Sequence, residues 1–212
     1  MTDLFDLIAA ERRATADFLE TLTDEQCATP SLCAGWQVRH VAAHLSMPLS
    51  IGLPKMFVGI LMNRGDFNRY SDKYAKAAGQ GQVSELAATI RANAASRFTP
   101  PGFGAHAPLT DIVVHTLDMR MPLGLPGDGP SKEAVNEILE FLMTPKATKG
   151  FLPKDRIPGL SYESTDTGWT GGSGPLVRGP ATALALALTG RAAGLDSLEG
   201  EGVPELRRRL GA

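Results

Sequence analysis

The chain has 212 residues, and 21 basic against 23 acidic side chains give it a formal net charge of −2 at pH 7. This balance excludes the basic surface that is typical of nucleic-acid-binding proteins. With 43% hydrophobic and 21% charged residues, the composition is that of a globular protein and excludes a disordered or collagen-like chain. We expect one large domain, or one domain with a small annex.

Two further features predict a cytoplasmic protein. The two cysteines, Cys27 and Cys33, are too few for a disulfide scaffold and lack the Cys-x-x-Cys spacing of a structural zinc site. The N-terminal segment MTDLFDLIAAERR lacks the basic-then-apolar order of a secretory signal. The most apolar stretch, residues 49–62, is shorter than the roughly 18 to 20 residues of a membrane span, so we expect no membrane segment.

Apolar residues recur at helical spacing along most of the chain. The predicted helices cover residues 3–23, 36–48, 83–98, 108–121, 131–144 and 180–190. Asp3 and Ser131 are candidate N-caps, and Pro108 and Pro180 are placed to open their helices. Residues 24–35 are expected to form a loop, and residues 63–82 show no clear periodicity.

The composition changes after residue 144. Residues 144–159 form a basic, proline-containing linker, and residues 159–179 are rich in Gly, Ser and Thr with short strand-like pieces, which is typical of a small hairpin. A short basic tail, VPELRRRL, follows the last helix. We therefore predict a mainly α protein with a helical bundle over residues 1–145 and a small C-terminal α+β region over residues 146–212.

The helix predicted at residues 108–121 carries a polar stripe. Asp111, His115 and Asp118 fall within about 60° of arc on one face, while most of the remaining circumference is apolar. A histidine between two carboxylates can hold a divalent cation. The alternative is that Asp111 favours the helix dipole and that the Asp/His pair is a surface interaction.

The second helix offers a further ligand. His40 lies opposite its apolar stripe and is interpreted as a solvated residue, whereas His44 lies on the flank of the stripe. His44 either forms a hydrogen bond across a helix interface or joins Asp111 and His115 at a metal ion. Two imidazoles and one carboxylate would leave a fourth position open, as catalytic zinc requires.

The sequence does not decide the roles of three neighbouring side chains. His106 lies in a loop beside Gly and Pro and is interpreted as exposed. Cys33 precedes the second helix, and no role is assigned to it. Trp36 either anchors the loop in the core or forms a wall of the site.

Three segments, SLCAGWQVRHVAAHL, PLTDIVVHTLDMRMPLG and VRGPATALALALTGR, resemble the mycothiol-dependent maleylpyruvate isomerase family of the DinB-like metalloenzyme superfamily. The resemblance implies a DinB-like four-helix bundle with a small C-terminal annex. It also implies one divalent metal, typically zinc, held by His44, Asp111 and His115. Well-described members of the family have Glu at the position of Asp111.

The resemblance also implies roles for other residues. Asp118 is expected in a supporting or catalytic role, and Arg191, or else Arg178, corresponds to an arginine that helps the substrate. Trp36 and Arg120 are the expected contacts to the thiol cofactor, which is mycothiol or another low-molecular-weight thiol. The thiol would take the open metal position.

The predicted function is activation of a thiolate for addition or transfer to a small electrophile, by a thiol-dependent isomerase or S-transferase. Two alternatives remain: a zinc-dependent hydrolase, in which water keeps the open position, and a non-catalytic metal-binding bundle. Thiol-independent turnover would favour the first. Metal binding without any effect of a thiol would favour the second. We expect a monomer or homodimer without a nucleic-acid or membrane partner, and the substrate stays open.

Overall fold

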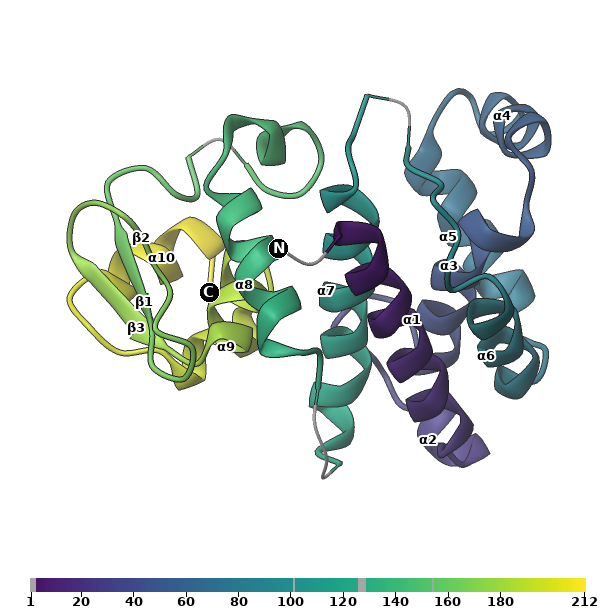
Figure 1. Ribbon diagram of the computed structural model, residues 1–212, viewed down its shortest axis with the longest axis horizontal. Coiled ribbons are helices and arrows are strands. Elements are labelled where there is room, and N and C mark those ends of the chain that lie inside the picture. The colour runs from purple at the N-terminus through teal and green to yellow at the C-terminus, as the bar shows by residue number, and fades with distance from the viewer. Residues whose placement is uncertain (1–2, 101, 126–128, 154) are drawn as a thin grey trace. The chain divides into compact units, whose positions relative to one another are not determined.

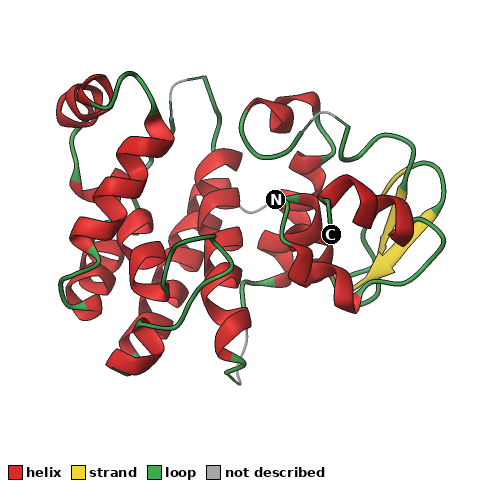
Figure 2. Ribbon diagram, turned by 180° about the vertical axis from the view of Figure 1, so that it is seen from behind, coloured by secondary structure: helices red, strands yellow, loops and turns green. Residues whose placement is uncertain are grey.

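A computed structural model describes residues 3–100, 102–125, 129–153 and 155–212. The described chain is mainly helical, and its one three-stranded sheet lies in the C-terminal part (Figures 1 and 2). The chain divides into two compact units, Met1–Gly129 and Pro130–Ala212. This division differs from the boundary predicted after residue 145, because helix α8 (Lys132–Leu142) packs against the C-terminal helix α9 (Ala181–Leu188).

Four helices of the first unit form a closed bundle, which confirms the predicted fold class. They are α1 (Leu4–Glu20), α3 (Val38–Ser50), α6 (Val83–Ala92) and α7 (His106–Leu123). Helix α1 packs against α6 and α7, and α3 packs against the same two helices. Three more helices lie outside this ring, namely α2 (Asp24–Cys27), α4 (Leu53–Met62) and α5 (Phe67–Ala78).

The first helix is shorter than predicted. Asp3 caps α1 as expected, and its Oδ1 accepts a hydrogen bond from the Phe5 amide at 3.0 Å. A second helix, α2, then begins within the expected loop. Thr23 and Gln26 form a reciprocal capping box that starts α2, and this local signal ends α1 three residues earlier than predicted.

Helix α7 extends two residues beyond the predicted segment at each end. Pro122 lies inside the last turn, one residue beyond the predicted end of the helix. Proline cannot donate to the Asp118 carbonyl, and that carbonyl instead accepts a hydrogen bond from the Leu32 amide at 3.1 Å. The helix ends at Gly124, which adopts the left-handed conformation at φ 57°.

The segment without periodicity contains α5, and α4 precedes it. Asp66 caps α5 by accepting from the Arg69 amide at 3.1 Å. Helix α5 packs against α3, so it brings polar side chains to the bundle from a part of the chain where the sequence predicted no element.

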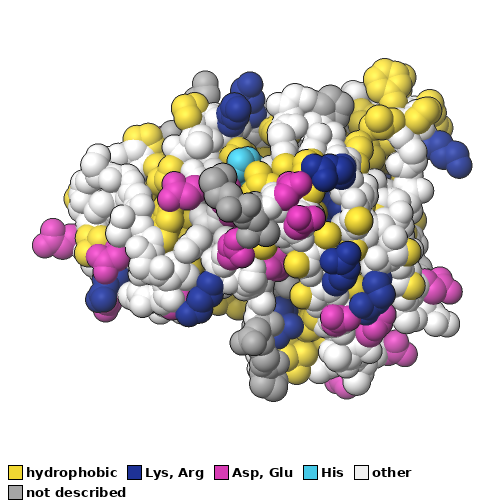
Figure 3. Space-filling view, in the orientation of Figure 1, with side chains coloured by type: hydrophobic (Ala, Val, Ile, Leu, Met, Phe, Trp, Pro, Cys, Tyr) yellow, Lys and Arg dark blue, Asp and Glu magenta, His cyan; other side chains and the backbone are white. Residues whose placement is uncertain are grey.

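Helix α4 exposes most of its apolar side chains. Figure 3 shows hydrophobic side chains gathered at the upper right, where Figure 1 places α4. The exposed residues of this helix are Leu53, Phe57, Val58, Leu61 and Met62. Met56 is its buried member, so α4 adds little to the core. None of the described helices has the length and apolar content needed to cross a lipid bilayer.

The second unit contains the predicted hairpin. Strand β1 (Ser161–Ser164) pairs antiparallel with β2 (Thr170–Gly172), and β3 (Leu176–Gly179) joins the other edge of β1 in parallel. Helix α9 follows Pro180 as expected and packs on β1 and β3. The remaining elements are the 3-10 helices η1 (Pro145–Lys149) and η2 (Ala192–Ser197) and the helix α10 (Val203–Leu210).

Candidate metal centre

Two bundle helices bring three side chains together. His44 projects from α3, while Asp111 and His115 lie one turn apart on α7. His44 Nε2 lies 3.4 Å from Asp111 Oδ1, and His115 Nε2 lies 3.5 Å from the same oxygen. The two imidazole rings are 4.8 Å apart at their centroids and nearly perpendicular. The three groups therefore face one another.

The spacing of these atoms fits metal ligands better than hydrogen bonds. Nitrogen–oxygen hydrogen bonds cluster near 2.9 to 3.0 Å, and both His–Asp111 distances exceed that value. Ligands held at about 2.0 to 2.1 Å by a tetrahedral zinc ion are separated by about 3.3 to 3.4 Å. The side chains are 12% (His44), 33% (Asp111) and 16% (His115) exposed, so the cluster is accessible mainly on the Asp111 side.

Each imidazole has a second partner on its other nitrogen. His44 Nδ1 lies 2.9 Å from Ser71 Oγ of α5, and His115 Nδ1 lies 2.9 Å from Asp118 Oδ2. Asp118 is fully buried and would accept the His115 Nδ1 proton. In metal sites such partners fix the ring orientation and leave the opposite nitrogen free to bind the ion.

The charge of Asp111 is stabilised by its surroundings. Partial burial would raise the pKa of its carboxyl group, but His44, His115 and Arg12 together lower it to about 2. The Arg12 side chain comes from α1, is 4% exposed, and donates to the carbonyls of Ala94 and Ser96. Asp111 is therefore ionised at neutral pH, as a metal ligand must be.

Trp36 lies beside the cluster. Its ring centroid is 5.3 Å from that of His44, and its indole Nε1 donates to Asp72 Oδ1 at 2.8 Å. The hydrogen bond fixes the indole next to the imidazole of His44. Its predicted contact with a thiol cofactor stays a prediction.

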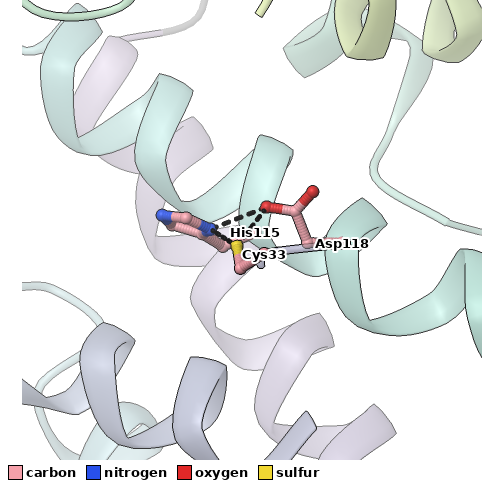
Figure 4. Close-up of side chains that lie close together, drawn as sticks. All are labelled: Cys33, His115 and Asp118. Carbon is pink, nitrogen blue, oxygen red and sulfur yellow. Dashed lines mark hydrogen bonds and ion pairs between the residues drawn. The ribbon is translucent and has the colours of Figure 1, made fainter. Parts of the chain in front are cut away.

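Cys33 lies close to His115 and Asp118 (Figure 4). Its Sγ lies 3.1 Å from Asp118 Oδ2 and 3.6 Å from His115 Nδ1. The Cys33 thiol and the Asp118 carboxylate both lie next to Nδ1 of His115. In a catalytic triad, by contrast, the nucleophile and the carboxylate contact different nitrogens of the imidazole. Because the short contacts to Asp118 have hydrogen-bond length, the geometry fits a hydrogen-bonded group that supports His115 better than a nucleophile.

The sequence did not assign roles to Ser71, Arg12 or Cys33. Ser71 belongs to the segment without periodicity, and Arg12 lies on the first helix, about 100 residues from Asp111 in sequence. Pro122 cannot donate to the Asp118 carbonyl, and this could have indicated that another segment contacts α7 there. Only the fold identifies that segment as the loop that carries Cys33.

The arginines expected at the site have contacts within their own units. Arg120 is about half a turn around α7 from Asp111, and its guanidinium lies 4.5 Å from the Phe18 ring centroid on α1. From this position, Arg120 does not point toward the three candidate ligands, so it is poorly placed to contact a cofactor bound there. Arg178 in the second unit pairs with Glu163 and Glu199. Arg191, also in the second unit, precedes η2 and donates from Nη1 to the Thr189 carbonyl at 2.7 Å, and its catalytic role stays a prediction.

The other two histidines also differ from their expected settings. His40 was interpreted as solvated, but it is 9% exposed because α5 covers that face of α3. A β-carbon added at Gly79, the cap of α5, would lie 2.7 Å from the His40 ring. His106 was expected in an exposed loop, but it is the first residue of α7 and is half-buried.

Comparison with known proteins finds a similarity within the first unit. Residues 8–96 match the family model described as the mycothiol maleylpyruvate isomerase N-terminal domain. This part of the first unit is therefore similar to that domain. The match includes His44 and Trp36 but ends before Asp111 and His115.

Solved structures extend the likeness to the fold of both units. A crystal structure of the mycothiol-dependent maleylpyruvate isomerase is 18% identical to this chain, with a TM-score of 0.54, and the likeness covers 95% of this chain and 96% of that one. A histidine-to-alanine mutant of the mycothiol-dependent maleylpyruvate isomerase gives 17% identity, the same TM-score and the same coverage. No curated protein gives a significant match. The likeness to these structures is one of fold and extends over nearly the whole of both chains.

Proposed function

We propose that the first unit binds one divalent cation, zinc in the first place, through His44 Nε2, Asp111 Oδ1 and His115 Nε2. The observation that carries the proposal is the placement of both Nε2 atoms 3.4 to 3.5 Å from a single carboxylate oxygen. Two neutral imidazoles and one carboxylate are a common ligand set of catalytic zinc.

The protein residues would prepare this site before any ion binds. Ser71 and Asp118 engage the Nδ1 atoms of the two histidines, so both Nε2 lone pairs point at the shared position. Arg12 helps to keep Asp111 ionised. When bound, the cation would supply Lewis acidity that favours the thiolate form of a thiol or the hydroxide form of water in its remaining position.

We further propose that the protein is a thiol-dependent isomerase that acts on a small electrophilic substrate, with mycothiol or a related low-molecular-weight thiol as cofactor. The family match of residues 8–96 and the similar fold of a mycothiol-dependent maleylpyruvate isomerase support this reaction class. Trp36 would form the wall beside the thiol. Arg191 is the proposed residue that helps the substrate, and Asp118 would hold the His115 proton during the reaction.

Elemental analysis of the purified protein tests the metal site. We expect about one equivalent of divalent metal, lost in His44→Ala and in His115→Ala because each variant removes a ligand. His40→Ala is the matched control on the same helix, and it should retain the metal even if it is less stable. Full retention of metal in both ligand variants would refute the site.

Turnover then separates the candidate functions. With maleylpyruvate as the probe, we expect isomerisation with mycothiol, little with glutathione and none without a thiol. Hydrolysis of ester or amide substrates that does not depend on thiol would favour a zinc hydrolase instead. Metal binding with no thiol-dependent turnover on a panel of electrophiles would favour a non-catalytic protein.

A further inference from the structure

The loop before α3 is attached to Asp118 at two points. The Leu32 amide donates to the Asp118 carbonyl at 3.1 Å, and the Cys33 thiol lies 3.1 Å from Asp118 Oδ2. The backbone contact exists because Pro122 leaves that carbonyl without its usual helical donor. One residue of α7 is therefore held through both its main chain and its side chain.

The loop itself is ordered by short-range hydrogen bonds. The Cys33 amide donates to Ser31 Oγ at 3.2 Å, and the Cys33 carbonyl accepts from the Trp36 amide at 2.9 Å. These contacts limit the positions that the thiol can take. Cys33 Sγ thus has a defined place next to Asp118 rather than that of a freely rotating surface group.

Asp118 Oδ2 is shared by two donors. It accepts from His115 Nδ1 at 2.9 Å and from Cys33 Sγ at 3.1 Å (Figure 4). A buried carboxylate needs such donors to compensate for lost water. The thiol proton stabilises the carboxylate and, through it, the orientation of the His115 ring.

We propose that Cys33 is a positioning residue of the metal centre. Its thiol donates to Asp118 Oδ2, and Asp118 in turn holds His115 with Nε2 directed at the metal position. The proposal rests on the proposed metal site and goes beyond it, because it assigns the affinity for the ion partly to a side chain that does not touch the ion.

Zinc affinity, measured by competition with a chromophoric chelator, tests this assignment. We expect Cys33→Ala to weaken zinc binding about three- to tenfold, less than the 10- to 100-fold typical of direct partners of a metal-bound histidine. Cys33→Ser keeps a hydroxyl donor and should stay within about twofold of the unmodified protein. Cys27→Ala is the matched control, because Cys27 is the buried cysteine of α2 and is grouped neither with the candidate ligands nor with Cys33 and Asp118.

A double-mutant cycle separates positioning from a general structural effect. If Cys33 acts through Asp118, Cys33→Ala should cause no further loss of zinc affinity in an Asp118→Ala background. The Co²⁺-loaded protein provides a second measurement, since a displaced His115 ring should change the visible absorption spectrum in Cys33→Ala and not in Cys33→Ser.

Three results would overturn the proposal. They are an unchanged affinity in Cys33→Ala, an equal loss in folded Cys33→Ser, and an undiminished effect of Cys33→Ala when Asp118 is absent. If Cys33→Ala does not fold, Cys33→Val takes its place, because valine has a similar volume and no hydrogen-bond donor, and the same outcomes apply to it. An unmodified protein that binds no zinc would refute the metal site as well, so the two failures are distinguishable.

Discussion

His40 and His44 occupy successive turns of α3 and have different surroundings. His44 faces α7 and the polar cluster, whereas His40 is covered by α5. The Gln37 amide donates to His40 Nδ1 at 3.1 Å, and the buried His40 Nε2 has no hydrogen-bond partner among the described residues. A neutral ring suits this position, and a protonated one does not.

This setting predicts how His40 affects stability as the pH falls. Burial, with the nearby charges of Arg39 and Lys76, lowers the pKa of His40 from its ordinary value of 6.5, and Asp72 acts in the opposite direction. Between the lowered value and 6.5 the unfolded chain binds more protons than the folded one. The stabilisation is therefore fully present above pH 6.5 and is lost as the pH falls below it.

The metal-free protein and its His40→Asn variant provide the comparison. Asparagine keeps an acceptor for the Gln37 amide but does not titrate. We expect the unfolding free energy of the unmodified protein to fall faster on acidification from pH 7 to 5, with a difference in slope of at most about 1.4 kcal/mol per pH unit. Urea unfolding at several pH values measures it. If the unfolding free energies of the two proteins changed in parallel with pH, His40 would not contribute to the pH dependence of stability.

At the scale of elements, the approach of α5 to α3 depends on a small residue at the end of α5. Gly79 caps α5 with an ordinary helical conformation, φ −69°, so glycine is not required there for its backbone freedom. A β-carbon would lie 2.7 Å from the His40 ring and 2.8 Å from the Ala75 carbonyl oxygen. The contact with His40 would force α5 and α3 apart, whereas the contact with the Ala75 carbonyl would strain the end of α5 itself.

We therefore expect Gly79→Ala to destabilise the protein by about 1 to 3 kcal/mol, as overpacked positions do. Gly81→Ala is the control two residues later, since its β-carbon would meet only the Ala78 carbonyl oxygen, at 3.4 Å, and should change the stability by less than about 0.5 kcal/mol. Thermal or urea unfolding of the two variants checks this difference. If both variants changed the stability equally, the contact between residue 79 and α3 would not be the cause of the destabilisation.

At the scale of the whole molecule, the residues proposed for metal binding and for substrate binding belong to different units. The three candidate ligands and their partners lie within Met1–Gly129, whereas Arg191 lies within Pro130–Ala212. The first unit also contains the complete four-helix ring. Metal binding should therefore need only the first unit, and turnover should need both.

Expression of residues 1–129 alone tests this division. We expect a folded helical protein that binds about one equivalent of zinc and has no thiol-dependent activity. In the full-length chain, Arg191→Ala should retain the metal and lose at least about tenfold in kcat/KM if the arginine helps the substrate. Circular dichroism, metal analysis and turnover assays provide the measurements. A folded fragment that binds no zinc would contradict the division.

Particular residues show how far local patterns reach. The i, i+4 spacing of Asp111 and His115 and the amphipathic stripe beneath His44 are short-range properties, and they predicted three side chains that the fold brings together. The same reasoning placed His40 in solvent, because it did not predict α5, the helix that buries it. Arg120 was grouped with the site by its motif, but its helical position directs it to Phe18.

By itself, the sequence determined the helical class, most helix starts, the small C-terminal hairpin and the candidate ligands, because hydrophobic periodicity, caps and turns depend on neighbouring residues. Tertiary structure decided which distant groups surround those ligands: Ser71, Arg12 and the Cys33–Asp118 pair. No pattern along the chain encodes such contacts. They arise only when four helices close into a ring and a loop amide donates a hydrogen bond to the carbonyl that a proline leaves without a donor.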